Sequence, residues 1–197
     1  MRKNPDETGI DLSHLLRHLR STITTRSKLD GIEAENIRKV ALAYLAKRPT
    51  KKQAAFDFSW ALKLHKQMFC DVWEFAGKLR TADVSIGLPW HQVETALDTL
   101  IKNLHVWNQA RTPLIEQAAW LHHRAVQIHP FLDGNGRWAR MMADIWLKQN
   151  RHEIIGWPST LKRRSPARAE YIQALKQADS GDLEPLINMH KRYSSKE

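Results

Sequence analysis

A short segment between two helical patterns, His129 to Arg140, constrains the fold of this chain more than any other feature. Apolar residues at four- and three-residue spacing lead into it and predict a buried helical stripe: Leu114, Ala118, Leu121, Ala125 and Ile128. Glycine then brackets a turn at residues 134–136, and apolar residues at helical spacing resume at Trp138 and run to about Gln149. The sequence therefore predicts a helix, a flexible loop and a second helix in immediate succession.

The residue types of this segment are those that a nucleotide-phosphate site requires. His129 is a candidate general base, and Asp133 offers a hard oxygen of the kind that Mg²⁺ binds together with substrate phosphates. A helix that begins after Gly136 would point free N–H groups at an anion and present Arg137 and Arg140 on one face. Because an ordinary turn needs neither base, acid nor arginine pair, we predict a phosphate site here.

Position for position, the segment resembles the signature of the Fic-domain family, His-Pro-Phe-x-(Asp/Glu)-Gly-Asn-Gly-Arg-x-x-Arg. The related death-on-curing toxins carry Ala-Asn-Lys where this chain has Gly134, Asn135 and Gly136. The resemblance, over about residues 28–192, implies an all-α Fic fold with a short β-hairpin flap. It also implies a Mg²⁺-dependent protein adenylyltransferase that moves AMP from ATP to a Ser, Thr or Tyr hydroxyl of a target protein.

The same resemblance assigns roles to residues of this chain. His129 becomes the catalytic base and Asp133 the Mg²⁺ ligand. The residues expected to bind nucleotide phosphate are Gly134, Asn135, Gly136, Arg137 and Arg140, the last of them at the γ-phosphate. Adenine needs an apolar or aromatic slot, for which Tyr171 and Trp138 are the candidates, with core packing as the alternative for either.

Residues 77–89 change character, since β-branched residues and polar alternation replace the helical pattern. The pattern predicts one hairpin, and the alternative is a plain loop between two helices. In Fic proteins a hairpin flap lies here and holds the extended backbone of the target by strand addition. The residues that resemble the flap pattern are Arg80, Val84, Ile86 and Gly87.

Many Fic proteins also carry an inhibitory helix, Ser/Thr-x-x-x-Glu-Gly/Asn, whose glutamate pairs with the second arginine of the motif. Residues 29–46 lie in the right place for it, although the match is imperfect. Glu33 is the preferred inhibitory residue and Glu35 the other candidate. The alternative is an acidic first turn that only stabilises a helix N-terminus, and control by an antitoxin-like protein stays open.

The length of 197 residues suits one domain, which we divide into an N-terminal extension (1–27), a Fic domain (28–192) and a polar tail (193–197). The single cysteine, Cys70, excludes an internal disulfide. The chain has neither an apolar run of membrane-spanning length nor a signal-peptide pattern, so we expect a cytoplasmic, toxin-like enzyme with no membrane partner. Self-association into a homo-oligomer stays open.

Other functions must be weighed against this one. A net charge of +10 raises the alternative of a nucleic-acid-associated protein with a vestigial Fic loop, but the basic residues are dispersed, and nucleic acid is not the expected partner. Within the family, the alternatives are removal of AMP or transfer of another phosphate-linked group. His122 and His123 lack the spacing of a metalloprotease site, and we expect them, like His65, to be packing or surface residues.

Overall fold

The computed structural model describes residues 12–23, 25–158, 161 and 165–194, and these residues are predominantly helical. The α-helices are α1 (Arg26–Leu45), α2 (Phe58–Phe69), α3 (Val93–Gln109), α4 (Leu114–Ile128), α5 (Asn135–Gln149), α6 (Pro166–Asp179) and α7 (Glu184–Ser194). The predicted all-α fold is confirmed. None of the helices in the described part of the chain is long and apolar enough to cross a membrane.

Side-chain caps set where several of these helices begin. The Asp57 carboxylate accepts a hydrogen bond from the Trp60 N–H at 2.7 Å and so caps α2. The Ser165 hydroxyl caps α6 in the same way, and Pro166 occupies the first helical position, where no N–H is needed. Thr25 caps α1, which therefore begins at Arg26, before the first residue of the predicted inhibitory segment.

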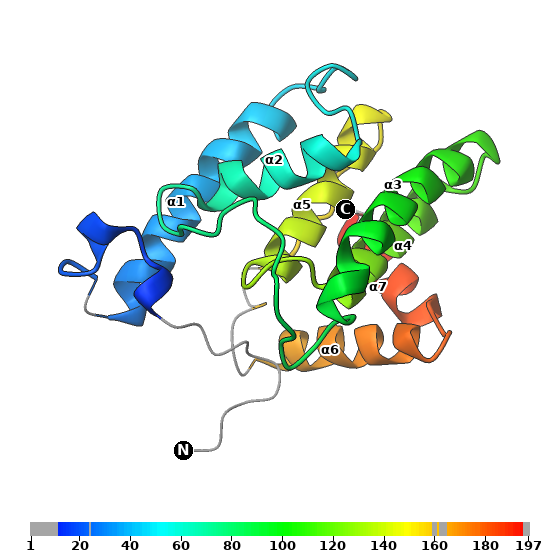
Figure 1. Cartoon of the computed structure of the whole chain (residues 1–197). Coiled ribbons are helices and arrows are strands. Elements are labelled where there is room, and N and C mark those ends of the chain that lie inside the picture. Colours follow the sequence, from blue (N-terminus) through cyan, green and yellow to red (C-terminus); the bar gives the residue numbers. More distant parts are fainter. Residues whose placement is uncertain (1–11, 24, 159–160, 162–164, 195–197) are drawn as a thin grey trace.

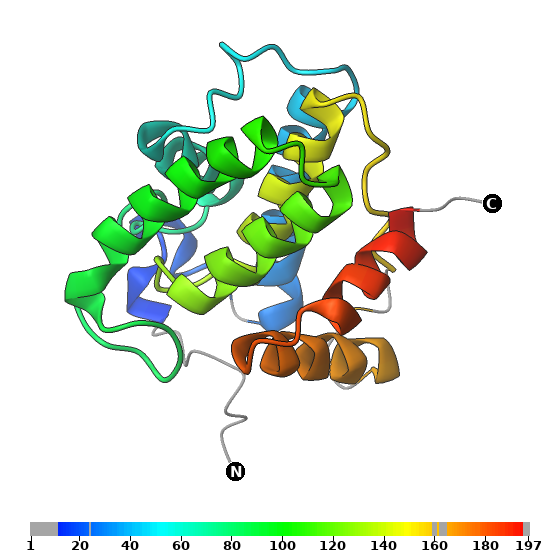
Figure 2. The same cartoon turned by 90° about the vertical axis from the view of Figure 1, so that its right-hand side faces the viewer.

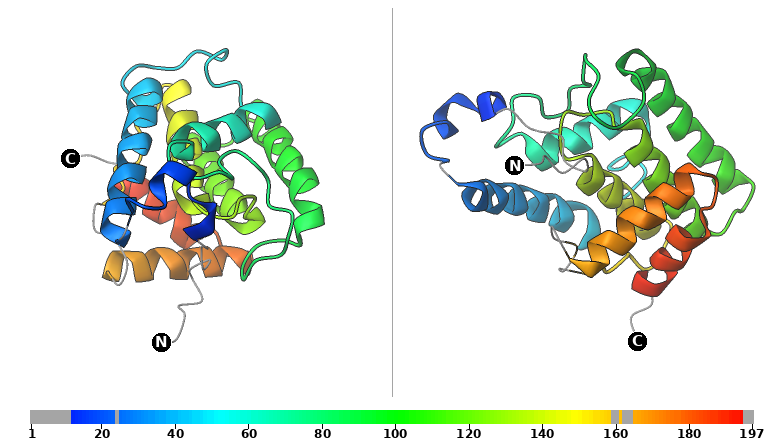
Figure 3. Two further views of the ribbon diagram at one scale, coloured as in Figure 1. Left: turned by 60° about the vertical axis from the view of Figure 1, so that its left-hand side comes forward. Right: turned by 90° about the horizontal axis from the view of Figure 1, so that it is seen from below.

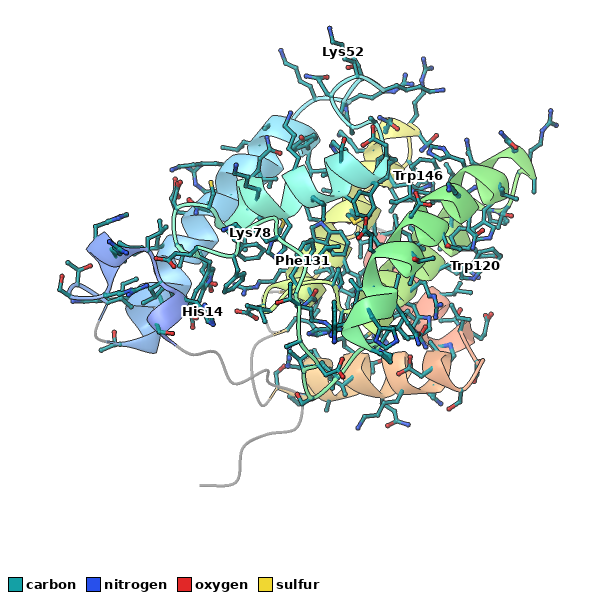
Figure 4. The ribbon with its side chains drawn as sticks, in the orientation of Figure 1. His14, Lys52, Lys78, Trp120, Phe131 and Trp146 are labelled. Atoms are coloured by element: carbon teal, nitrogen blue, oxygen red, sulfur yellow. The ribbon has the colours of Figure 1, made fainter. Side chains whose placement is uncertain are left out.

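The helices α4 and α5 pack along each other and form the centre of the molecule (Figure 1). The pair α1 and α2 covers α5 on one side, and α3 lies beside α4 (Figure 2). The main core fills the space between these five helices and contains aromatic rings in contact, with Phe56 tilted against Trp60 and edge-on to Trp146. In Figure 4, Phe131 and Trp146 lie within the helical body, whereas Lys52 points away from it.

A second, smaller core lies under the hairpin of α6 and α7, which packs against α4. It is built from Tyr171, Ala174, Leu175, Leu186 and Met189. The beginning of α5 consequently lies between α1 on one side and α6 on the other (Figure 3). The phosphate loop predicted from sequence is therefore positioned between two differently built regions of the molecule.

Residues ahead of α1 add to the main core. Two short 3₁₀ turns, Leu12–His14 and Arg17–Leu19, carry Leu15 into the interior, where it is 1% exposed. The Leu16 N–H donates to the Val72 carbonyl at 3.0 Å, and Leu15 forms an isolated antiparallel bridge with Trp73. This segment thereby fixes the turn that follows α2.

The predicted hairpin at residues 77–89 is wrong, because no strand forms anywhere in this segment. Its backbone pairs with the end of α4 and the loop that follows it instead of with itself: the Arg80 N–H donates to the Pro130 carbonyl at 3.0 Å, and the Leu88 N–H donates to the Ile128 carbonyl at 3.4 Å. The buried Arg80 side chain donates to the carbonyls of Ala82 and Leu88, which a hairpin would otherwise have used for its own ladder. Below, residues 80–88 are called the flap segment.

Candidate active site

His129 ends α4 with a left-handed backbone, φ 54°, and so turns the chain sharply into the loop. Its Nδ1 lies 3.3 Å from the Val126 carbonyl, which can only accept, so Nδ1 carries the proton. Nε2 is buried and has no hydrogen-bond partner among the residues that the structure describes. Burial lowers the pKa of His129 to about 4, against a smaller opposing effect of the Val126 hydrogen bond. The imidazole is therefore neutral, with a free lone pair, which is the form a general base requires.

The loop after His129 is shaped by one glycine and one asparagine. Gly134 has φ +81°, and a Cβ at this position would lie 2.6 Å from the ring of Phe69, so a larger residue does not fit. Asn135 braces the turn through Phe131, accepting from its N–H at 2.9 Å and donating to its carbonyl at 2.8 Å. The first helical hydrogen bond of α5 runs from Trp138 to Gly134, so the N–H groups of residues 135–137 are available to an anion.

His65, for which we predicted only packing, holds this loop in place from α2. Its Nε2–H donates to the Asp133 carbonyl at 3.0 Å, while Nδ1 accepts the Gly77 N–H at 2.9 Å. The ring also stacks on Phe131, with centroids 3.6 Å apart. Burial lowers the pKa of His65 to about 3, so it is neutral and can donate and accept at once. A lone histidine on an amphipathic helix carries no sequence signal for such a role.

Arg137 is held by two carboxylates. Its guanidinium contacts Glu33 at 2.7 and 3.3 Å and Asp133 at 3.2 Å. Glu33 is only 1% exposed and also accepts from the Trp73 indole N–H at 2.7 Å. Burial alone would lower the pKa of Arg137, but the charges of Glu33 and Asp133 raise it overall. The cation nearest the predicted phosphate site is thus already neutralised by the protein.

This pairing corrects one prediction and separates the two inhibitory candidates. We expected the inhibitory glutamate to face the second motif arginine, Arg140, but Glu33 contacts the first, Arg137, because α1 packs on that side of α5. Glu35 points to solvent instead and forms a two-pronged ion pair with Arg38, both contacts at 2.8 Å. Only Glu33 lies at the site.

Arg140 has different surroundings. It donates to the Tyr171 hydroxyl at 3.4 Å, and its guanidinium carbon lies 5.5 Å from the Tyr171 ring centre and 5.9 Å from that of Trp157. Within the described residues, no carboxylate oxygen lies within 4.0 Å of its guanidinium nitrogens. Arg140 therefore faces the site as a cation whose charge no ion pair in the described part of the chain cancels.

The two adenine candidates are both buried. Trp138 is fully buried, donates its indole N–H to the Ala61 carbonyl at 3.0 Å and packs edge-on against Phe131, as the core-packing alternative expects. Tyr171 is 2% exposed, and its hydroxyl is engaged by His122 as well as Arg140.

The flap segment packs against His129. The Arg80 guanidinium donates to the His129 carbonyl at 2.7 Å. Gly87 lies so close that a Cβ there would be 2.5 Å from the Cβ of His129, and its φ of +108° also favours glycine. Val84 is half-buried, whereas Ile86 is 38% exposed. All four residues predicted for the flap therefore lie in one segment that contacts His129, although the segment is not a hairpin.

Comparison with known proteins agrees with this geometry. Residues 55–147, from before α2 to near the end of α5, match the model of the Fic/DOC family. The "Protein adenylyltransferase fic-1" of Caenorhabditis briggsae is 32% identical over 124 residues, which are 60% of this chain and 23% of that protein. The "Protein adenylyltransferase Fic" of Nematostella vectensis is 28% identical over 164 residues, 79% of this chain and 36% of that protein. The chain thus spans about a quarter to a third of these relatives.

Solved structures share the fold. A fragment of Fic-1 from C. elegans superimposes with a TM-score of 0.70 at 24% identity, over 89% of this chain and 52% of that one. The BepC protein of Bartonella tribocorum, solved with bound AMPPNP, gives a TM-score of 0.68 at 18% identity, over 96% of this chain and 99% of that one. The arrangement of helices around the loop is therefore that of Fic proteins.

Proposed function

Since this chain contains a Fic domain, we propose that it is a protein adenylyltransferase, which transfers AMP from ATP to a Ser, Thr or Tyr hydroxyl of another protein. The observation that carries this proposal is the neutral, buried His129, whose Nε2 has no hydrogen-bond partner among the described residues and which directly precedes the loop that leads into Arg137 and Arg140 on α5. The names of the relatives support the same activity.

In the proposed reaction, the target hydroxyl gives its proton to Nε2 of His129, and its oxygen attacks the α-phosphorus of ATP. The bond from that phosphorus to the bridging oxygen breaks, and pyrophosphate leaves with the electron pair. Charge that develops on the phosphate oxygens would be stabilised by the N–H groups of residues 135–137 and by Arg137. Arg140, one turn further along α5, would bind the γ-phosphate.

Asp133 fits the requirements of a Mg²⁺ ligand. Its side chain is 18% exposed at the mouth of the loop, beside Arg137. The described residues contain no group of three or more candidate metal ligands, but Mg²⁺ that is carried by ATP needs only one or two carboxylates, because phosphates and water supply the rest. Such an ion would neutralise charge on the phosphates; Asp133 would hold it at the loop.

Glu33 gives the proposal a regulatory component. The carboxylate occupies the Arg137 guanidinium that a nucleotide phosphate would need, so the arrangement is that of a restrained enzyme. Because Glu33 belongs to α1 and Arg137 to α5, a shift of α1 would release the arginine. An antitoxin-like regulator or self-association could act on the same contact, and these remain predictions from the sequence, as do the cytoplasmic location and the division at residue 28.

The flap segment would dock the target. Ile86 in this segment and Trp90 just after it are exposed, and Gly87 brings the backbone of the segment against His129. A target chain that lies along this backbone would present its hydroxyl to Nε2. Among the described residues, no hydrogen bond engages the backbone of residues 83–87, so its groups would be available for such an addition.

The decisive experiment treats a cell lysate with the purified chain, Mg²⁺ and ATP that is isotope-labelled on the α-phosphate, and identifies labelled proteins by mass spectrometry. We expect AMP on hydroxyl side chains with the wild-type protein. His129→Ala should reduce labelling by about 10²-fold or more, the contribution of a general base, without weakening nucleotide binding. Wild-type labelling by His129→Ala would refute the assignment of the base. Label from the γ-phosphate, or loss of AMP from a modified protein, would point instead to the other family reactions.

A further inference from the structure

Three buried side chains connect Arg140 to the core below α6 and α7. The Tyr171 hydroxyl, which accepts from Arg140, lies 2.9 Å from Nε2 of His122. Nδ1 of His122 lies 3.2 Å from Nε2 of His190, and Nδ1 of His190 lies 2.8 Å from the Leu186 carbonyl. Both histidines are fully buried and Tyr171 is 2% exposed, so water does not complete these contacts.

The hydrogen bonds that link Arg140, Tyr171, His122, His190 and the Leu186 carbonyl can all be satisfied with only one choice of donors and acceptors. The Leu186 carbonyl accepts, so Nδ1 of His190 must donate, and in a neutral ring Nε2 must then accept. The same rule makes Nδ1 of His122 a donor and its Nε2 an acceptor, which requires the Tyr171 hydroxyl to donate. The hydroxyl oxygen is left as the acceptor for Arg140. Burial lowers the pKa of His122 well below its usual value and that of His190 to about 4, in agreement with neutral rings.

We propose that Tyr171, His122 and His190 form a one-way hydrogen-bond relay that positions Arg140 for the terminal phosphate of the nucleotide. The inference rests on the proposed function, which places the γ-phosphate at Arg140. The relay holds a cation through a neutral hydroxyl oxygen and two ring faces, those of Tyr171 and Trp157. An ion pair would hold it at least as firmly but would compete with the phosphate.

The surrounding rings make the relay rigid. Trp157 packs edge-on against His122, His190 and Tyr171, with centroid distances of 5.4, 5.1 and 5.9 Å. His122 and Tyr171 stack with an angle of 20° between their planes. These ring contacts support the side chains that hold the Arg140 guanidinium.

If the relay positions Arg140 at the γ-phosphate, its loss should weaken binding of nucleotides that carry a γ-phosphate and leave binding of those without one nearly unchanged. Calorimetry would use the α,β-methylene analogues of ATP and ADP, which cannot transfer AMP and which differ only in the terminal phosphate. Tyr171→Phe should weaken binding of the ATP analogue by about tenfold and that of the ADP analogue by less than about twofold, because only the former reaches Arg140. The matched control is Tyr193→Phe, which removes a hydroxyl from the neighbouring α7 without touching the relay and should change neither constant.

Variants of His122 test the direction of the relay, including the case in which Tyr171→Phe does not fold. Glutamine offers one acceptor and one donor, so His122→Gln should keep the preference for the ATP analogue. Leucine offers neither, so His122→Leu should lose it. Equal effects of the two variants on both analogues would mean that His122 is only a packing residue and would overturn the proposal.

Nitrogen NMR of the full chain gives a readout that is independent of nucleotide. At pH 7 both His122 and His190 should be neutral, with the proton on Nδ1; a proton on Nε2 of either residue would overturn the relay. The wild-type measurements also separate the two proposals. If the protein labels targets with AMP but binds both analogues equally, adenylyl transfer stands and the relay's purpose is refuted. If it neither labels targets nor binds either analogue, the proposed function itself fails.

Discussion

The two sides of the phosphate loop hold their arginines by opposite means. On the α1 side, Arg137 is neutralised by Glu33 and Asp133, both within 3.3 Å. On the α6 side, Arg140 rests on a hydroxyl and two aromatic rings, and no carboxylate oxygen of the described residues lies within 4.0 Å of its guanidinium nitrogens. A carboxylate stabilises the cation but must be displaced before a phosphate can bind, whereas the aromatic support stays in place. The first arrangement suits control, and the second suits recognition.

The largest expected effect is on the rate of AMP transfer when Arg137, the arginine on the α1 side, is removed. In a Glu33→Gln background, Arg137→Ala should reduce AMP transfer by about 10²-fold, as for loss of a charge-assisted contact to a developing anion. Arg124→Ala, an exposed arginine of α4, is the control and should leave the rate unchanged. Initial rates of target labelling measure both. A rate that survives Arg137→Ala would mean that the pair with Glu33 is purely structural.

The next effect in size is on the free energy of unfolding, which should differ between variants of Glu33 and Glu35. Glu33→Gln removes the charge of a buried ion pair while it keeps the side-chain shape, and should lower the free energy of unfolding by about 2 kcal/mol. Glu35→Gln, on the same helix but in an exposed pair, should leave stability unchanged. Urea denaturation followed by circular dichroism measures this difference. Equal unfolding curves for wild type and Glu33→Gln would show that the α1 contact stabilises nothing.

The same two variants should then separate in activity. If Glu33 restrains the enzyme, Glu33→Gln should raise self-labelling with ATP by about tenfold, which corresponds to about 1.4 kcal/mol of released restraint. Glu35→Gln should keep the wild-type level. The rise should vanish when Arg137→Ala is added, since relief requires the freed arginine. No rise with Glu33→Gln would leave control to a partner or to self-association.

The smallest expected effect is on how the free energy of unfolding depends on pH through His190, on the α6 side of the loop. Burial lowers the pKa of His190 from 6.5 to about 4, so the unfolded chain takes up a proton before the folded one does. Stability is therefore complete above pH 6.5 and falls as the pH drops from 6.5 towards 4. His190→Gln should reduce this loss between pH 7.5 and 5.5 by roughly 1 kcal/mol, as measured by urea unfolding at each pH. Tyr193→Phe, on the same helix, should keep the wild-type dependence; an identical loss in His190→Gln would contradict the assignment.

Contiguous residues made the loop predictable from sequence. His129, Asp133 and Arg137 lie within nine positions, so their spacing alone determines that a helix end, a turn and a helix start bring them together. Glu33 was harder, since it meets Arg137 across 104 positions and only the family resemblance suggested the contact. Which arginine it meets depends on how α1 packs against α5, and the sequence did not reveal that.

Other features that the sequence did not indicate have the same physical origin. The alternation in residues 77–89 favoured a hairpin, but the buried Arg80 side chain takes the carbonyls that a ladder would need. Trp138 and Tyr171 are aromatic residues near the motif, and single aromatic residues do not indicate whether they face a ligand or a core. His122 and His190 meet across 68 positions and carry no local pattern. Helix content could be predicted from the sequence, whereas side-chain contacts between residues far apart in the sequence could not.

The Arg80 contacts also bear on how the flap segment moves. The Arg80 guanidinium donates hydrogen bonds to the carbonyls of Ala82, Leu88 and His129, and so links the two ends of the segment to each other and to the backbone of His129. Closing a loop of about this length costs roughly 2 kcal/mol of chain entropy, which folding has already supplied before a target arrives. A binding target therefore meets a pre-ordered edge and loses less affinity to ordering. Because Arg80 also binds the His129 carbonyl, a displacement of the segment would move the backbone of His129, so in the proposed reaction target docking and alignment of His129 would occur together.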